Sequence, residues 1–331
     1  MRSGNDANMK FIQDTMRDLS QPGPVTRELI DLLKERVLPA NETSRETGWK
    51  SCTMVFTNET RHKFNEVFVR DWAMRNGARL FRWNNKLANV HSEDDGSLYR
   101  LLPETLTRLA AIGMPVVLNQ NVKGSVHIGV VNGAQATLRD FVFTSDRDRA
   151  AFRDAQDSGP DNDTGEIHIP RPDCVIVGIR RCDLVGAKLL NRELDESELL
   201  VPIGLRSRST KYMGFTITYG ELAFDSAFVM TDYRLQSKTL AHLTLELTRE
   251  PRKPGKGITS QALYVGLTRV RSFEGLHVLP NNYGAPLDMD HLLELKHDKY
   301  LVAWDKSYSA NGVFDPNLAY RTCEEVWGRS A

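Results

Sequence analysis

The sequence predicts an α/β fold that is interrupted by a β-rich insertion, and three observations support this prediction. A strand, a turn and a helix follow one another early in residues 51–114. Strand patterns without intervening helices dominate residues 115–215. The alternation of helices and strands returns in residues 216–280. We therefore expect one α/β domain in two parts, with the insertion between them.

A helical lead-in segment, residues 1–50, precedes this domain. Apolar side chains recur at helical spacing from Met9 to Leu19 and again from Leu29 to Leu33, on either side of two prolines. The segment carries eight positive and eight negative charges, which cancel. We expect a solvated segment that packs against the α/β domain.

The first part of the domain begins with the apolar run CTMVF, which predicts a strand that ends at Thr57-Asn58. Residues 61–79 predict a helix closed by Gly77, because glycine readily adopts the left-handed conformation that often follows a helix. Most large apolar side chains of this helix fall on one face: Phe64, Val67, Phe68, Trp72 and Met74.

The insertion is predicted to contain four strands and one long loop. Residues 112–121 and 133–143 predict two strands, with a turn signal at Asn132-Gly133 between them. Residues 144–163 hold six Asp, three Arg and a single large apolar residue, so we expect an exposed loop. Two further strands are expected around residues 174–179 and 199–203.

The second part of the domain opens with the strand pattern GFTITYG and continues to the strand HLTLEL. A loop rich in Pro, Lys and Gly follows at residues 251–257. The string QALYVGLTRVRSFEGLHVL, residues 261–279, predicts a helix, a turn and a final strand. Residues 281–331 form a C-terminal tail.

The composition predicts a globular protein of a reducing compartment. The 331 residues include 43 basic and 43 acidic side chains, which excludes a wholly basic nucleic-acid wrapper. Residues 206–271 nevertheless hold eleven Lys and Arg against five Asp and Glu, a surplus of six. No apolar run reaches the roughly 18 residues of a membrane helix, and the N-terminus lacks the apolar core of a signal peptide. The four cysteines are scattered, which is typical of free thiols.

The sequence predicts neither a metal site nor a phosphate-binding loop. Cys174 and Cys182 are eight residues apart, and no second pair of Cys or His shows zinc spacing. A phosphate loop needs G-x-x-x-x-G-K-[ST], but Gly257 follows the sole Gly-Lys dipeptide, Gly255-Lys256. Asp195-Glu196 does not follow a buried apolar strand, so no acidic pair is expected to hold Mg²⁺.

Two segments about thirty residues apart resemble motifs of superfamily-one helicases of the PIF type. LYVGLTRVRSFEGLHVL, residues 263–279, is similar to motif VI, which that family writes approximately as LYVALSRV-x-S-x-EGL. AFVMTDYRLQSKTL, residues 227–240, is similar to motif V, approximately AYAMTIHKSQGQTL, and aligns without a gap. The residues that correspond to the family's Thr, His, Lys and Gln are Thr231, Tyr233, Arg234 and Gln236.

Two weaker similarities extend the resemblance to about residues 50–280. TMVFTNETRHKFNEVF, residues 53–68, is similar to the family's strand that ends in Thr-Asn. GMPVVLNQN and VVNGAQATLRDF, within residues 113–141, are similar to a segment that borders the family's small inserted barrel. Tyr233 and the tail pattern at 304–315 favour the helicases of rolling-circle, Helitron-like transposons.

The resemblance implies a RecA-like second motor domain of the P-loop NTPase class with a small β-barrel insertion. It implies that Arg269 is catalytic and contacts the γ-phosphate, because a planar guanidinium suits the charge on a transferred phosphoryl group. It further implies nucleotide binding by Gln236 and Arg269, and contact with single-stranded DNA by a second set of residues: Thr231, Tyr233, Arg234, Thr57 and Asn58.

Purely structural interpretations of these residues stay open. Arg269 is otherwise a surface arginine that pairs with an acid, and Tyr233 and Arg234 are otherwise a polar helix start. Ser237 replaces the family's glycine, and Asp232 adds a negative charge near the expected phosphate path. Both departures favour a degenerate, inactive copy.

By resemblance, the cofactors are ATP and Mg²⁺, and the partners are single-stranded DNA and an N-terminal motor domain that is missing here. The expected protein is an intracellular, nuclear ATP-dependent helicase with a role in DNA repair, recombination, telomere maintenance or transposon replication; this chain alone is expected to be inactive. A degenerate remnant that binds DNA or protein is one alternative, and a RecD-like or relaxase-linked helicase half is another. No membrane association is expected.

Overall fold

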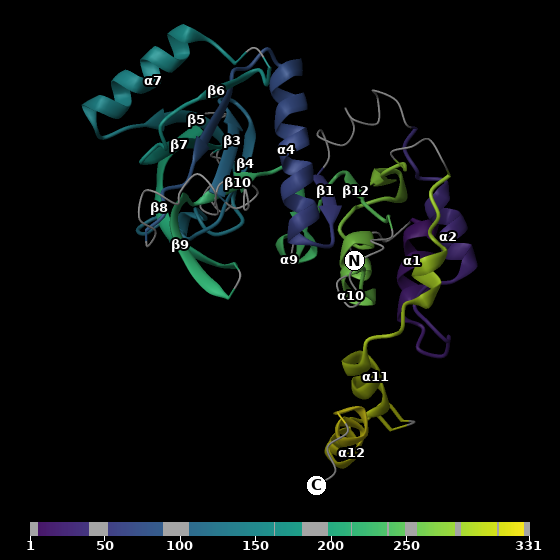
Figure 1. Ribbon diagram of the computed structural model, residues 1–331. Helices are drawn as coiled ribbons and strands as arrows, with labels where there is room; N and C mark the ends of the chain where they lie inside the picture. Colours follow the sequence, from purple (N-terminus) through teal and green to yellow (C-terminus); the bar gives the residue numbers. More distant parts are fainter. Residues whose placement is uncertain are drawn as a thin grey trace, which may run out of the picture. The chain divides into compact units, whose positions relative to one another are not determined.

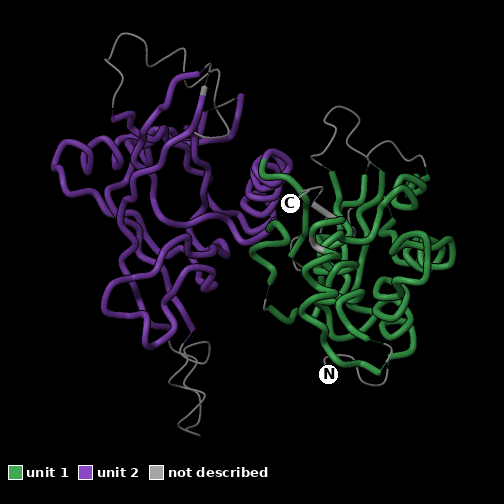
Figure 2. The backbone as a smooth tube through the Cα atoms, turned by 90° about the horizontal axis from the view of Figure 1, so that it is seen from below, with its two compact units in different colours: residues 1–58, 230–331 green, residues 59–229 purple. Residues whose placement is uncertain are grey.

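The computed structural model describes residues 6–39, 52–88, 106–161, 163–180, 198–212, 214–236, 238–248, 257–281, 286–309 and 311–327. The chain forms two compact units (Figure 2). The first unit combines residues 1–58 with residues 230–331, and the second comprises residues 59–229. The chain therefore leaves the first unit, builds the second and then returns.

The first unit contains a four-stranded sheet with the order β11-β1-β12-β13. Its strands are β1 (Cys52–Val55), β11 (Val229–Thr231), β12 (Leu243–Leu245) and β13 (Leu276–Val278). β12 runs parallel to both β1 and β13. Parallel neighbours need a crossover, and α10 (Ser260–Leu267) supplies it between β12 and β13. The mixed α/β architecture with a parallel sheet agrees with the prediction.

Two N-terminal helices belong to the core of this unit (Figure 1). α1 (Ala7–Arg17) and α2 (Arg27–Lys34) begin at residues whose side chains cap the first turn, Asp6 and Thr26. Their fully buried side chains are Met9, Ile12, Leu29, Ile30 and Leu33. The residues after α2 then pair with β13 through a bridge from Val37 to Val278. The predicted lead-in is therefore helical and is also an integral part of the α/β unit.

The C-terminal residues add short helices to the first unit: η4 (Asp290–Glu294), α11 (Lys299–Lys306) and α12 (Pro316–Trp327). Asp298 caps α11 by accepting hydrogen bonds from the Tyr300 and Leu301 amides. The rings of Trp304, Tyr308 and Phe314 pack together beside α11.

The second unit is built on a six-stranded sheet in which every neighbouring pair is antiparallel. In spatial order, its strands are β10 (Phe224–Ser226), β4 (Pro115–Leu118), β5 (Gln135–Val142), β7 (Cys174–Arg180), β8 (Glu198–Tyr212) and β9 (Phe215–Leu222). A three-stranded sheet has the order β3 (Thr107–Ala111), β2 (Leu80–Asn84) and β6 (Glu166–His168). The helical elements are α4 (Asn58–Arg75), η1 (Val126–Ile128) and α7 (Asp146–Ser158).

The boundaries of this unit differ from the predicted insertion at 115–215. β9 was expected in the α/β domain, but it pairs with β8 along its whole length, from Leu205↔Leu222 to Tyr212↔Phe215. The hairpin turns at Gly214, whose φ of 84° favours glycine. β2 and most of α4 also belong to the second unit, because β2 pairs with β3 and β6. Long-range pairing overrode the change of local pattern that suggested the boundaries.

Residues 146–158 form the helix α7, so the prediction of a loop throughout 144–163 is wrong. The Ser145 side chain caps the helix. Asp146 and Asp148 lie in its first turn, where their negative charges interact favourably with the positive end of the helix dipole. Phe152 packs against Phe81 and Phe143. One aromatic side chain and a good cap therefore suffice to order this acidic stretch as a helix on the surface.

The predicted apolar face of α4 is only partly buried. Phe68 and Trp72 pack against Phe228, whereas Val67 and Met74 are exposed. The buried residues of α4 include the charged Arg61. Among the described residues, no helix has the length and apolar character to cross a membrane.

Candidate functional site

The expected DNA-contacting residues directly follow two neighbouring strands of the four-stranded sheet. Thr57 and Asn58 come after β1, and Thr231 ends β11, which lies next to β1. Thr231 is the N-cap residue of the short helix α9 (Asp232–Leu235), which carries Tyr233 and Arg234. The five residues come from two chain segments that are far apart in the sequence and adjacent in the sheet.

The side chains of this segment differ sharply in exposure. Tyr233 is 79% exposed, which leaves its ring available for stacking. Leu235 is fully buried and anchors α9. Gln236 is exposed, and its amide donates to the Asp232 carbonyl to end the helix. An exposed ring on an anchored turn is a suitable platform for a nucleic-acid base.

Cations gather around this turn. The charge of Arg234 adds to the effect of burial in lowering the pKa of Lys238, so the two basic groups lie close enough to interact. Burial raises the pKa of Asp232, and the Tyr233 amide partly opposes this change. Burial also raises the pKa of the neighbouring Cys52 to about 12, so this thiol stays neutral. The two cations suit a phosphate backbone.

Arg269 follows α10, and its side chain folds back over the last turn of that helix. Its Nε donates to the Val265 carbonyl at 3.1 Å, and its Nη2 donates to the Thr268 hydroxyl at 3.0 Å. That hydroxyl in turn donates to the Tyr264 carbonyl at 2.8 Å. The guanidinium is therefore held at the negative end of the α10 dipole, while its side chain is only half-buried. Arg271 is exposed.

Backbone contacts join the segment that contains Arg269 to the segment that contains Tyr233. The Leu240 amide donates to the Arg269 carbonyl at 2.8 Å, and Leu240 also bridges to Val270. Gly275, in the 3₁₀ turn η3 (Phe273–Gly275), lies so close to the Ala241 carbonyl that a Cβ would overlap with it. The two segments therefore form one structural piece.

Several predicted features lie outside the described residues. They are Ser237, Cys182, Asp195-Glu196 and Gly255-Lys256. Across the part of the chain that the structure describes, no group of three or more His, Cys, Asp and Glu side chains is arranged to hold a metal ion.

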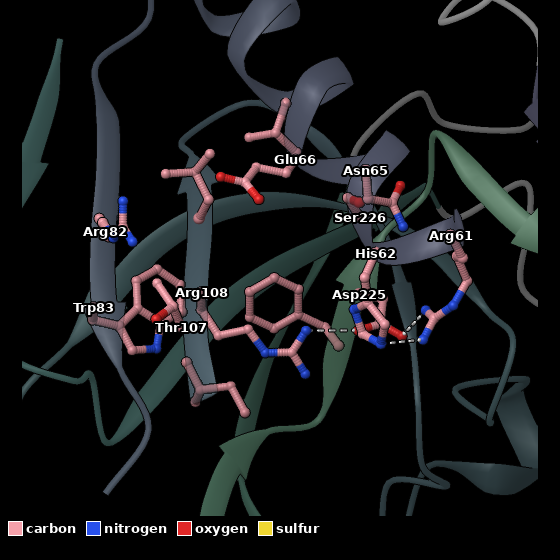
Figure 3. A pocket seen from close by; sticks show the side chains of 14 residues that line it. Arg61, His62, Asn65, Glu66, Arg82, Trp83, Thr107, Arg108, Asp225 and Ser226 are labelled. Carbon is pink, nitrogen blue, oxygen red and sulfur yellow. Dashed lines mark hydrogen bonds and ion pairs between the residues drawn. The ribbon is translucent and has the colours of Figure 1, made fainter. Parts of the chain in front are cut away.

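A cavity in the second unit was not expected from the sequence. It lies between α4, β2, β3 and β10, and its lining includes Arg61, His62, Trp83, Arg108 and Asp225 (Figure 3). These residues come from four separate stretches of chain, and only Arg61 and His62 lie in a segment, residues 53–68, that the family resemblance covers. No charge pattern in the sequence marks the cavity, because the three arginines of α4 are spread along the helix and only Arg61 lines it.

Solved helicase structures share this fold, although no family model and no curated protein matches the sequence. Bacteroides Pif1 bound to ssDNA matches 94% of this chain at 13% identity, with a TM-score of 0.53 and 56% of that chain covered. Bacteroides Pif1 in complex with ADP-AlF3 and ssDNA matches 94% at 14% identity, with a TM-score of 0.51 and 56% covered. A structure of two coordinating Pif1 helicases, which concerns DNA unwinding at forked dsDNA, matches 94% of this chain at 14% identity. Its TM-score is 0.52, and 54% of that chain is covered.

The chain thus has the fold of PIF-type superfamily-one helicases and spans just over half the length of these structures. The prediction of a PIF-type fold is confirmed.

Proposed function

We propose that this chain is the C-terminal motor half of an ATP-dependent DNA helicase of the PIF type. The observation that carries the proposal is the backbone hydrogen bond from Leu240 to Arg269. It ties the segment with an exposed stacking ring, Tyr233, to the segment with an arginine suited to a transferred phosphoryl group. A helicase needs such a connection, since it couples nucleotide hydrolysis to movement on a strand.

The proposed roles follow from the chemistry of each side chain. Tyr233 stacks on a base, Arg234 contacts a phosphate, and three smaller side chains complete the contact with single-stranded DNA: Thr231, Thr57 and Asn58. Gln236 bonds the nucleotide or a loop beside it. Arg269 leaves the last turn of α10, where its Nε and Nη2 donate to the Val265 carbonyl and the Thr268 hydroxyl, and meets the γ-phosphate.

The residues present fit one side of a nucleotide site. Arg269 supplies planar donors and a permanent charge, whereas the sequence contains no phosphate loop of the G-x-x-x-x-G-K-[ST] form. ATP and Mg²⁺ would therefore be held chiefly by a first motor domain, in cis or in trans. In the same proposal, the six-stranded sheet corresponds to the family's small inserted barrel, and the helicase works in the nucleus on transposon or chromosomal DNA.

Reconstitution with a matching first motor domain tests this proposal. The assembly should hydrolyse ATP in a DNA-stimulated manner, and Arg269→Ala should lower kcat by about 10³-fold or more. Arg269→Lys should recover little, because a point charge does not reproduce the planar fork. Arg271→Ala is the matched control, since this exposed arginine lies two residues away. An assembly whose kcat is indifferent to Arg269 would contradict the assignment.

A degenerate copy is the second candidate, and Asp232 favours it. Asp232 stands at the start of α9, beside the proposed phosphate path. Burial raises the pKa of its carboxyl group, and the group occupies this position whether or not it is charged. A degenerate copy would bind single-stranded DNA and give no ATPase in the same reconstituted assembly. Recovery of ATPase by Asp232→Ile would identify this residue as the lesion.

A further inference from the structure

The cavity of the second unit is small, partly open and lined by both rings and charges. Its volume is about 90 Å³. Trp83 and Arg108 are directly opposite each other on β2 and β3, so their side chains share one face of that sheet. Glu66 and His62 reach the cavity from α4, and Asp225 reaches it from β10 (Figure 3). The cavity lies wholly within the second unit.

Positive charge exceeds negative charge in the ion-pair network on one side of this cavity. Among the described residues, four arginines share two carboxylates: Arg61, Arg108, Arg206 and Arg208 with Asp225 and Glu221. Arg61 and Arg108 each take one oxygen of Asp225, at 2.7 and 3.1 Å. Even without Arg208, which is largely exposed, the three remaining arginines outnumber the two carboxylates.

The neighbouring groups do not remove this surplus. His62 lies 3.2 Å from the Arg61 guanidinium, and burial together with the charges of Arg61 and Arg108 lowers its pKa to about 4. The ring is therefore neutral near pH 7. Glu66 carries a negative charge, but it is paired with Arg70 at 3.0 Å. Arg82, which precedes Trp83 in β2, is paired with Glu166.

One buried donor in the lining has no partner among the described residues. Trp83 is 3% exposed, and no acceptor from the described part of the chain lies within hydrogen-bond reach of its Nε1. A buried N–H without a partner is costly and uncommon in native structures. Trp83 Nε1–H therefore lacks an acceptor among the described residues, and it belongs to a side chain that lines a cavity with surplus positive charge.

We propose that this cavity binds an oxyanion, a phosphate group that accepts a hydrogen bond from Trp83 Nε1–H beside Arg108. An anion supplies the missing acceptor and offsets the surplus of arginine charge, whereas a metal cation does neither. The group comes either from free inorganic phosphate or from the backbone of a nucleic-acid strand. The inference does not depend on the helicase proposal, because no residue of the first unit takes part.

The Trp83 indole proton reports the proposed bond directly. In ¹H–¹⁵N spectra, titration with inorganic phosphate at constant ionic strength should move one indole signal downfield, and Trp83→Phe should delete that signal. By calorimetry, Trp83→Phe should bind phosphate about tenfold or more weakly, since hydrogen bonds to charged groups are worth this much. Trp304→Phe, at an exposed tryptophan, is the matched control and should change nothing.

A second variant tests the charge argument with the opposite sign. Glu66→Gln keeps the shape of a half-exposed side chain and removes a negative charge from the lining. Phosphate should bind several-fold more tightly to this variant. Unchanged or weaker binding would contradict the electrostatic basis of the site.

The source of the phosphate is identified by comparing three probes: inorganic phosphate, a dT oligonucleotide, and the same oligonucleotide with an uncharged methylphosphonate backbone. A Trp83 shift with phosphate alone indicates a free ion, and a shift with the charged oligonucleotide indicates the strand. An equal shift with the uncharged oligonucleotide would overturn the proposal, because the contact would then be to a base. A Trp83 signal that moves with none of the probes would overturn it as well.

Discussion

The two units of this protein place their candidate sites in different ways. In the first unit, most residues of interest lie in two short segments, each continuous in the chain, that meet through the backbone of Leu240 and Arg269, and Thr57 and Asn58 follow the neighbouring strand β1. In the second unit, the cavity is assembled from single side chains of α4, β2, β3 and β10. Only the first kind of site leaves a recognisable string in the sequence.

The contacts that hold the two sites together also differ. The first unit relies on backbone pairing and close approach, as at Gly275 against Ala241. The second relies on buried charges, with Arg61 and Asp225 both less than a tenth exposed. Buried ion pairs are sensitive to the loss of one partner, because the remaining charge is then uncompensated. Close contacts with the backbone, such as that of Gly275, are instead disrupted when a larger side chain is introduced.

Removal of one buried carboxylate should have the largest effect on stability. Asp225→Ala leaves Arg61 and Arg108 without this partner and should lower the free energy of unfolding by about 3–5 kcal/mol. Hydrogen exchange should rise in the second unit and stay unchanged in the first. Asp146→Ala, which breaks a pair at the exposed start of α7, is the control and should change nothing measurable. If Asp225→Ala and Asp146→Ala lowered the free energy of unfolding equally, the second unit would not depend on its buried charges in the way described.

Acid should weaken the second unit through His62. Its pKa is lowered to about 4 from an ordinary 6.5, so the neutral ring stabilises the folded state above pH 6.5. This contribution is lost as the pH falls from 6.5 towards 4, and it amounts to at most about 3 kcal/mol. Stability should be measured by urea unfolding between pH 7 and 4. His62→Gln should flatten the slope, and an unchanged slope would assign the acid sensitivity to other groups, such as Asp225 and Glu221.

Added volume should affect the first unit instead. Gly275→Ala places a Cβ against the Ala241 carbonyl, which belongs to the backbone and has little room to move. We expect a loss of about 1–3 kcal/mol in the free energy of unfolding, as for other overpacked sites. Gly257→Ala is the control, because a Cβ there meets no neighbour. If Gly275→Ala raised hydrogen exchange in the second unit, this result would contradict the assignment of the Gly275–Ala241 contact to the first unit.

The smallest expected effect concerns α9, which carries the proposed DNA-contacting residues Tyr233 and Arg234. Arg234→Ala should reduce the salt dependence of single-strand binding by close to one phosphate contact, without changing stability appreciably. Affinity would be measured by fluorescence anisotropy between about 50 and 200 mM salt. Tyr233→Ala should weaken binding at every salt concentration and leave the slope unchanged, because stacking releases no counterions. The reverse pattern would exchange the roles of these residues.

Much of the first unit was predictable from local patterns. The strand at residues 52–55, the helix at 260–267 and the strand at 276–278 follow from apolar periodicity and caps. The motif resemblance singled out Arg269 and Tyr233, and the structure shows that their segments touch. Their roles stay predictions.

The second unit shows what local patterns miss. The pairing of β8 with β9, the assignment of α4 to this unit and the helix α7 depend on distant partners. Trp83 is buried, yet only the three-dimensional structure shows that its Nε1 has no hydrogen-bond partner among the described residues. A sequence records which side chains exist but not which of them face each other across a cavity.

The sequence by itself determined the α/β class and the two segments that resemble helicase motifs. These depend on spacing along the chain, which is set by helix and strand periods of 3.6 and 2.0 residues. Only the tertiary structure decided where the units divide and that Arg61, Arg108 and Asp225 form one buried network. The physical reason is that burial and charge compensation depend on the neighbours in space, and in this chain Arg61 and Asp225 are 164 residues apart.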